Sequence, residues 1–187
     1  RPAQCGAARG SDRLFADPGH QPGAAALIAT ELVAAAEAAA DLAGGIIRPL
    51  FRSALLVEAK GDASPVTEAD RAAERALRAY LTERFPSHGI MGEEYGTERG
   101  DAEYLWVLDP IDGTRAFLTG RPLFGTLIGL LRHGEPVLGL IDQPVTRERW
   151  LGVAGQPTRF ISPMGGMAAC RPCPTLATAE LSCTSPE

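Results

Sequence analysis

The sequence predicts an α+β fold, in which two helices come first and a group of antiparallel-looking strands follows. Two stretches in the first half carry apolar residues at the spacing of an amphipathic helix. Later stretches are short, apolar and separated by turn residues, as in a strand meander. Because helices and strands do not alternate along the chain, a repeated βαβ arrangement is not expected.

The composition favours one globular domain. The chain has 187 residues, of which 45% are hydrophobic, and a net charge of −5. An acidic balance without a basic cluster argues against nucleic acid as a partner. No apolar run approaches the roughly 20 residues that cross a bilayer, and residues 1–22 lack the apolar region of a secretory signal, so no membrane partner is expected. The 4 cysteines lie near the two ends, which fits a reducing, cytoplasmic setting.

The first element should be a helix. Residues 1–22 show no periodicity and are expected to form a disordered leader. From about Ala24 to Gly44 the apolar residues have helical spacing, and Gly44-Gly45 should end the helix. The apolar run from Ile46 to Leu55 contains Pro49, which predicts a second helical piece after a kink.

A second helix is expected after a short strand and a loop. Val57–Lys60 is the strand candidate and residues 61–65 are the loop. Thr67–Phe85 has a stripe of leucines and alanines at helical spacing, with acidic residues in its first turn that complement the helix dipole. The helix should begin at Thr67 or Glu68 and end before Pro86.

Strands should make up most of the remainder. The five candidates are His88–Met91, Leu105–Leu108, Leu123–Leu131, Pro136–Asp142 and Arg147–Val153. A polar loop should join the first two candidates, and His133-Gly134-Glu135 should form a hairpin turn between the third and fourth. After Gly155 no long periodic element is expected.

The most informative stretch is D-P-I-D-G-T, directly after the strand at residues 105–108. Pro110 forces Asp109 towards an extended conformation, Gly113 permits a tight reversal, and Thr114 can cap a following helix. Two carboxylates, Asp109 and Asp112, on a stiff backbone suit Mg²⁺, which takes oxygen ligands. The alternative is a pair of ordinary turns in which both acids are merely solvated.

Carboxylates or hydroxyls also stand at strand ends or helix starts in V-T-E-A-D (66–70) and G-E-E (92–94). If these places meet, Glu93, Asp109 and Asp112 can hold divalent cations, and Asp70 with Thr114 can orient a water molecule. A metal pair of this type activates water and stabilises both oxygens of a phosphoryl transfer, so no protein nucleophile is needed.

The anion should bind at the start of the helix after Gly113. Backbone N–H groups of Gly113, Thr114 and Arg115 can meet a phosphate there. The sequence contains neither a G-x-S-x-G elbow nor a histidine-based triad, which agrees with a reaction that uses no covalent intermediate.

Three motifs in this order resemble the inositol monophosphatase family. They are the run from Lys60 to Asp70, the G-E-E at 92–94, and W-V-L-D-P-I-D-G-T at 106–114. The segments at 113–117 and 119–126 look most like the histidinol-phosphatase branch. The family fold is a layered αβαβα sandwich, so residues 23–160 would form its N-terminal part, with paired helices on a mainly antiparallel sheet.

The resemblance implies a role for each candidate residue. The Mg²⁺ ligands would be Glu93, Asp109, Asp112, the backbone carbonyl of Ile111 and, for a further ion, Asp70. The residues that act in catalysis would be Asp70, Glu93 and Thr114. The substrate phosphate would meet Gly113, Thr114 and Arg115.

The resemblance also implies an activity. It is that of a Mg²⁺-dependent phosphate monoester hydrolase acting on a small phosphorylated substrate, with histidinol phosphate, an intermediate of histidine biosynthesis, as the first choice. The alternatives are inositol 1-phosphate and a related sugar or nucleotide phosphate. Full-length relatives are commonly homodimers.

One departure from the family pattern bears on activity. The family has a further metal-binding Asp in a W-D or Y-D context in its C-terminal half, and neither dipeptide occurs after residue 112. The chain is therefore expected to be an N-terminal part, with residues 161–187 as a loop-rich tail leading to a missing half. The alternative to an enzyme is a truncated, inactive fragment.

Overall fold

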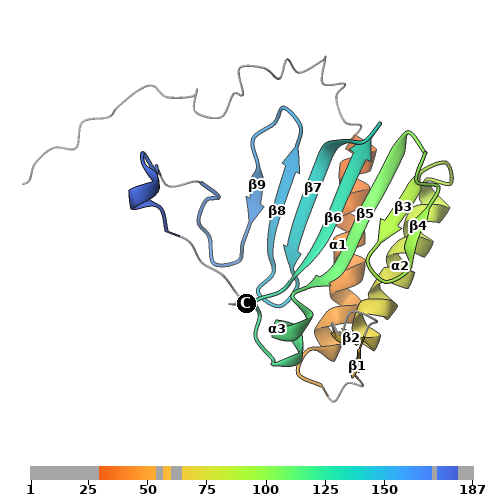
Figure 1. The fold of residues 1–187 in the computed structure, drawn as a ribbon, viewed down its shortest axis with the longest axis horizontal. Coiled ribbons are helices and arrows are strands. Elements are labelled where there is room, and N and C mark those ends of the chain that lie inside the picture. Colours follow the sequence, from red (N-terminus) through yellow and green to blue (C-terminus); the bar gives the residue numbers. More distant parts are fainter. Residues whose placement is uncertain (1–29, 54–56, 60–64, 170–171, 181–187) are drawn as a thin grey trace, which may run out of the picture.

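A computed structural model describes residues 30–53, 57–59, 65–169 and 172–180. It shows two helices packed on one face of a seven-stranded sheet, which confirms the α+β prediction (Figure 1). The expected leader at residues 1–22, the first residues of the expected first helix and most of the loop at 61–65 lie outside the described residues.

Helix α1 runs from Thr30 to Leu50 without a break, so the predicted stop at Gly44-Gly45 and the separate helical piece after it are wrong. The reason is tertiary packing, since a row of alanines and Ile47 on one face of α1 are buried. Gly44 is part of that face, where a Cβ would lie 3.4 Å from the Cβ of Pro144. Pro49 stands in the last turn, where it has no N–H to donate to the carbonyl of Gly45, and the helix ends one residue later.

Helix α2 runs from Glu68 to Arg84, close to the predicted bounds. Thr67 is its N-cap: the Thr67 hydroxyl oxygen accepts from the backbone N–H of Ala69 (3.1 Å) and Asp70 (3.4 Å), and the Thr67 N–H donates to the Asp70 carboxylate (2.9 Å). This reciprocal capping box fixes where the helix begins. Before it, β1 (Val57–Ala59) pairs with β2 (Pro65–Thr67) in a two-stranded antiparallel ribbon.

The large sheet has the strand order β4-β3-β5-β6-β7-β8-β9, and among these described strands β3 and β5 are the one pair that runs in parallel. Its strands are β3 (Gly89–Gly92), β4 (Gly96–Glu98), β5 (Tyr104–Asp112), β6 (Gly125–Arg132), β7 (Glu135–Gln143), β8 (Glu148–Val153) and β9 (Arg159–Ile161). All five strand candidates are confirmed, with shifted ends. Strands β4 and β9 were not predicted, because edge strands of 3 residues carry too few side chains to show a period of two. The short helices are α3 (Thr114–Leu118) and η1 (Leu176–Thr178).

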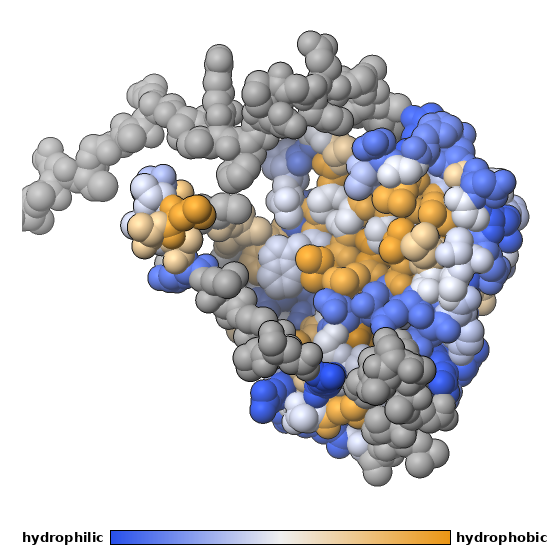
Figure 2. Space-filling model, viewed as in Figure 1, coloured by the Kyte–Doolittle hydropathy of each residue, from blue (hydrophilic) through white to orange (hydrophobic). Residues whose placement is uncertain are grey.

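The core lies between the two helices and one face of the sheet. Trp106 and Leu130 on that face and Leu77 on α2 are fully buried. The other face has no helix on it in the described part of the chain and carries a broad apolar area, which includes the half-exposed Ile141 (Figure 2). None of the described helices is long and apolar enough to span a bilayer.

Candidate metal and phosphate site

The site is built around the end of β5. The ladder between β5 and β6 is regular up to Asp109, shifts register, and resumes at Asp112 opposite Gly125. Pro110 has no N–H to donate in this interval, and its carbonyl accepts a hydrogen bond from the Thr126 hydroxyl (2.8 Å). The irregularity turns two acids three residues apart towards the same end of the sheet.

Glu93 comes to this end from β3. Its backbone N–H donates to the carbonyl of Leu108 (3.2 Å), which places Glu93 beside the last residues of β5. Burial raises the pKa of the Asp109 carboxyl to about 7, and the charges of Glu93 and Asp112 and a hydrogen bond with Glu93 add to this shift. The fold thus brings together the three carboxylates that the sequence singled out.

The three carboxylates are neighbours but are not arranged as a closed metal-binding cluster. Within the described residues, no set of three or more His, Cys, Asp or Glu side chains is arranged tightly enough to enclose a metal ion. The donor set nevertheless suits a hard divalent cation, since it consists of carboxylate oxygens. Such a cation would also offset the repulsion from Glu93 and Asp112, which adds to the effect of burial on the pKa of Asp109.

Asp70 and Thr114 meet although 44 residues separate them. Asp70 is buried in the first turn of α2, and burial raises its pKa even though hydrogen bonds from Thr67 and Thr114 favour the charged form. The Thr114 hydroxyl lies 3.4 Å from an Asp70 carboxylate oxygen and 3.3 Å from the carbonyl of Ile111. A hydroxyl has one proton, so Thr114 donates to one of these oxygens at a time.

Gly113 makes the reversal between β5 and α3. Its φ of 96° lies in the left-handed region, and a Cβ there would approach the carbonyl oxygen of Leu123 to 3.0 Å. Gly113 is itself the N-cap of α3 and Thr114 is the first helical residue, so the expectation that Thr114 caps this helix is wrong. The Thr114 side chain is thereby free to point towards Asp70. Arg115 follows on the exposed side of α3.

Glu74 is a residue of this region that the sequence analysis missed. It is completely buried on α2, accepts from Nε of Arg78 (2.8 Å), and accepts from the backbone N–H groups of Glu94 (2.7 Å) and Tyr95 (3.2 Å). It therefore fixes the segment that carries Glu93. Gly92 makes room for it, because a Cβ there would lie 1.9 Å from the Glu74 carboxylate. The available signal was a Glu–Arg pair, four residues apart, on the apolar stripe of the predicted helix.

Residues 29–184 match the inositol monophosphatase family model. The chain is 48% identical over 155 residues to the bifunctional phosphatase IMPL2 of Arabidopsis thaliana, covering 82% of this chain and 44% of the relative. It is 38% identical over 120 residues to a histidinol-phosphatase of Mycobacterium tuberculosis, covering 64% and 46%.

Solved structures show the same fold. An inositol monophosphatase from Zymomonas mobilis is 51% identical, with a TM-score of 0.65 over 78% of this chain and 55% of that one. An inositol monophosphatase from Thermotoga maritima is 30% identical, with a TM-score of 0.65 over 70% and 51%. The chain thus spans about half the length of the relatives it matches.

Proposed function

Since this chain belongs to the inositol monophosphatase family, we propose that it forms the metal-binding part of a Mg²⁺-dependent phosphatase that acts on small phosphate monoesters. The observation that carries the proposal is the meeting of Glu93, Asp109 and Asp112 at the end of β5. The alternative was that both aspartates are solvated acids in adjacent turns. That alternative does not account for Glu93, which a backbone hydrogen bond to Leu108 holds beside them from another strand.

The proposed Mg²⁺ ligands are four carboxylates and one backbone carbonyl from three places in the sequence: Asp70, Glu93, and the stretch that contains Asp109, Ile111 and Asp112. When bound, Mg²⁺ ions lower the pKa of water and stabilise charge on phosphoryl oxygens. The Asp109 carboxyl has to lose its proton before it can act as a ligand, so its raised pKa makes metal binding depend on pH near neutrality.

The proposed work of the remaining residues is positioning. Thr114, held between Asp70 and the Ile111 carbonyl, orients the attacking water. The buried Asp70 carboxylate accepts the proton that this water loses. Gly113 leaves the backbone accessible where the phosphate would meet the N–H groups of residues 113–115, and the Arg115 guanidinium would pair with its oxygens.

The proposed substrate is histidinol phosphate. Support comes from histidinol-phosphatases of three bacteria that are 38–40% identical to this chain. Inositol 1-phosphate is the second candidate, because the inositol monophosphatase from Zymomonas mobilis is 51% identical.

The experiment that tests the proposal measures metal binding and turnover separately. Calorimetry with MgCl₂ on this chain at pH 8 should show saturable binding that Asp112→Asn removes and Asp101→Asn, in an exposed turn, retains. Phosphate release from histidinol phosphate and inositol 1-phosphate is then measured with the same proteins. Mg²⁺ binding without release from either ester would make the chain a metal-binding fragment, and the absence of Mg²⁺ binding by a folded chain would refute the proposal.

A further inference from the structure

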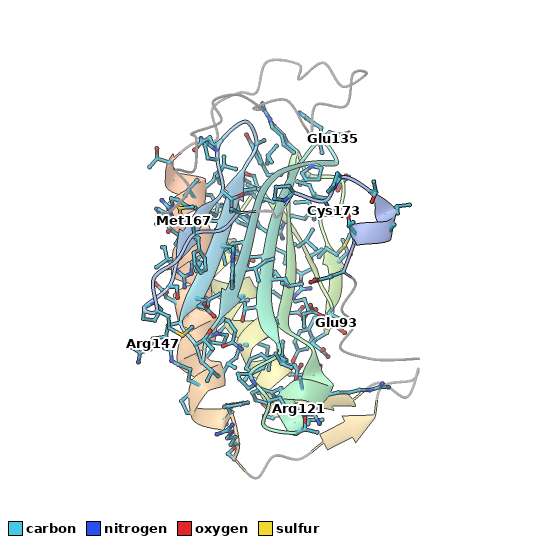
Figure 3. All side chains as sticks on the ribbon, turned by 90° about the vertical axis from the view of Figure 1, so that its left-hand side faces the viewer. Glu93, Arg121, Glu135, Arg147, Met167 and Cys173 are labelled. Carbon is cyan, nitrogen blue, oxygen red and sulfur yellow. The ribbon has the colours of Figure 1, made fainter. Side chains whose placement is uncertain are left out.

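A second pocket lies apart from the carboxylates at the end of β5. It has a volume of about 430 Å³ and opens between α1, β7, β8, β9 and the turn that joins β7 to β8. Its charged lining consists of Asp41, Arg48, Asp142, Arg147 and Arg149. Figure 3 places Arg147 and Glu93 on opposite sides of the molecule. None of the pocket residues has a role in the function proposed above.

Arg149 is the fixed centre of the pocket wall. Its Nε donates to an Asp142 carboxylate oxygen and its Nη2 to an Asp41 oxygen, both at 2.7 Å. Its side chain is only 15% exposed. One guanidinium thus neutralises part of the charge of two carboxylates and ties α1 to β7 and β8.

Arg48 enters the pocket along the surface of α1. Its guanidinium lies over Gly44, where a Cβ would come within 2.6 Å of Nη1. Arg48 forms no ion pair with any of the described residues. Burial raises the pKa of the Asp142 carboxyl, and the charge of Arg48 is one of those that oppose this shift by favouring the ionised form. The absence of a side chain at Gly44 therefore sets the position of this cation.

Arg147 enters from the turn between β7 and β8. It has a φ of 60°, and its N–H donates to the carbonyl of Gln143 (2.8 Å). The Gln143 side chain holds the same turn by accepting from the N–H groups of Val145 (2.7 Å) and Thr146 (2.9 Å). Among the described residues Arg147, like Arg48, has no carboxylate partner, although its backbone is fixed.

We propose that this pocket binds a small tetrahedral oxyanion of the phosphate class, held between Arg48 and Arg147 with Arg149 behind them. Three arginines face two aspartates, which leaves one positive charge in excess, and the two arginines without a carboxylate partner present their donors to the pocket. Guanidinium groups match the geometry of phosphate oxygens and bind them with charge-assisted hydrogen bonds. This site needs no metal ion and is separate from the position proposed for the substrate phosphate.

The test is calorimetric titration of the whole chain with inorganic phosphate at low ionic strength in EDTA, which removes any metal-dependent binding. Saturable binding is expected, and Arg48→Gln and Arg147→Gln should each weaken it by about tenfold, the effect of one charge-assisted hydrogen bond. Arg132→Gln is the matched control, because Arg132 pairs with Glu103 outside the pocket. Gly44→Ala keeps every charge, displaces only the end of the Arg48 side chain, and should weaken binding as well.

Glycerol phosphate and succinate separate the classes of ligand. Binding of phosphate, glycerol phosphate or both, with the expected losses in the pocket variants, supports the proposal. Absence of saturable binding, equal affinity in Arg48→Gln and Arg147→Gln, equal loss in Arg132→Gln, or succinate binding as tight as that of phosphate would overturn it.

Discussion

Replacing Glu74 by Gln should strongly destabilise the fold, because it removes the charge that compensates a nearly buried arginine. Glu74 is completely buried and Arg78 is 9% exposed. Arg78 keeps a second partner, since its Nη1 lies 2.9 Å from a Glu98 oxygen, but Glu98 is 54% exposed and its charge is screened by solvent. Breaking a buried ion pair typically costs about 3–5 kcal/mol, and the remaining Glu98 contact sets the expected loss at the lower limit, about 3 kcal/mol.

Thermal unfolding followed by circular dichroism measures this loss. For a domain of this size, about 3 kcal/mol corresponds to a fall in Tm of about 6–12 °C. The matched control is Glu103→Gln, which breaks an ion pair of similar length with Arg132 (2.9 Å) whose side chains are 35% and 48% exposed. The control should lose less than about 1 kcal/mol.

The same substitution should weaken Mg²⁺ binding, because the Glu74 carboxylate also accepts from the N–H groups of residues 94 and 95, next to Glu93. A Tm for Glu74→Gln that equals that of Glu103→Gln would refute the argument from burial. Unchanged Mg²⁺ affinity together with a lowered Tm would show that Glu74 supports the fold without positioning Glu93.

Two further predictions concern the proposed metal and phosphate site. In the metal-free chain the pKa of Asp109 is about 7 in the folded state, above the ordinary value of 3.8. The folded state therefore binds the Asp109 proton more tightly than the unfolded state does. The stability gained from this proton is complete below pH 4 and is lost as the pH rises through 7. Asp109→Asn should therefore raise the stability of the EDTA-treated chain at pH 8, by about 2 kcal/mol after a discount for partial exposure, and leave it unchanged at pH 4; equal Tm values for the two proteins at pH 8 would contradict this. Gly113→Ala should lower the free energy of unfolding by about 1–2 kcal/mol because of its positive φ, and further because the new Cβ meets the Leu123 carbonyl. Gly134→Ala is also at positive φ but has open space around it, so it should show the conformational cost alone. Chemical denaturation of both variants compares the two losses.

The exposed sheet face bears on how these experiments are carried out. Ile141 is 49% exposed and Leu123 is 60% exposed on a chain that spans about half the length of its relatives. Apolar surfaces of this kind promote association between molecules. Each stability measurement should therefore be repeated at two protein concentrations, since a Tm that rises with concentration reports assembly as well as folding.

The sequence by itself determined the fold class, the second helix with Thr67 at its N-terminus, and the strand that leads into Asp109. These features are local: a capping residue, a repeated apolar spacing and a proline act over a few residues, so their effect is visible in the sequence. The sequence also singled out Glu93, Asp109 and Asp112, because each follows a predicted strand and belongs to one of the ordered motifs that resemble the inositol monophosphatase family.

Tertiary structure decided where local signals competed with packing. Gly44 lies inside a helix although glycine favours a stop, because the buried face of α1 on both sides of it packs against the sheet. Glu74 looked like any helical surface acid until the fold placed Arg78 and two backbone N–H groups around it. The pairing of Asp70 with Thr114 joins residues 44 positions apart, and only the chain's path through space brings such residues within hydrogen-bonding distance.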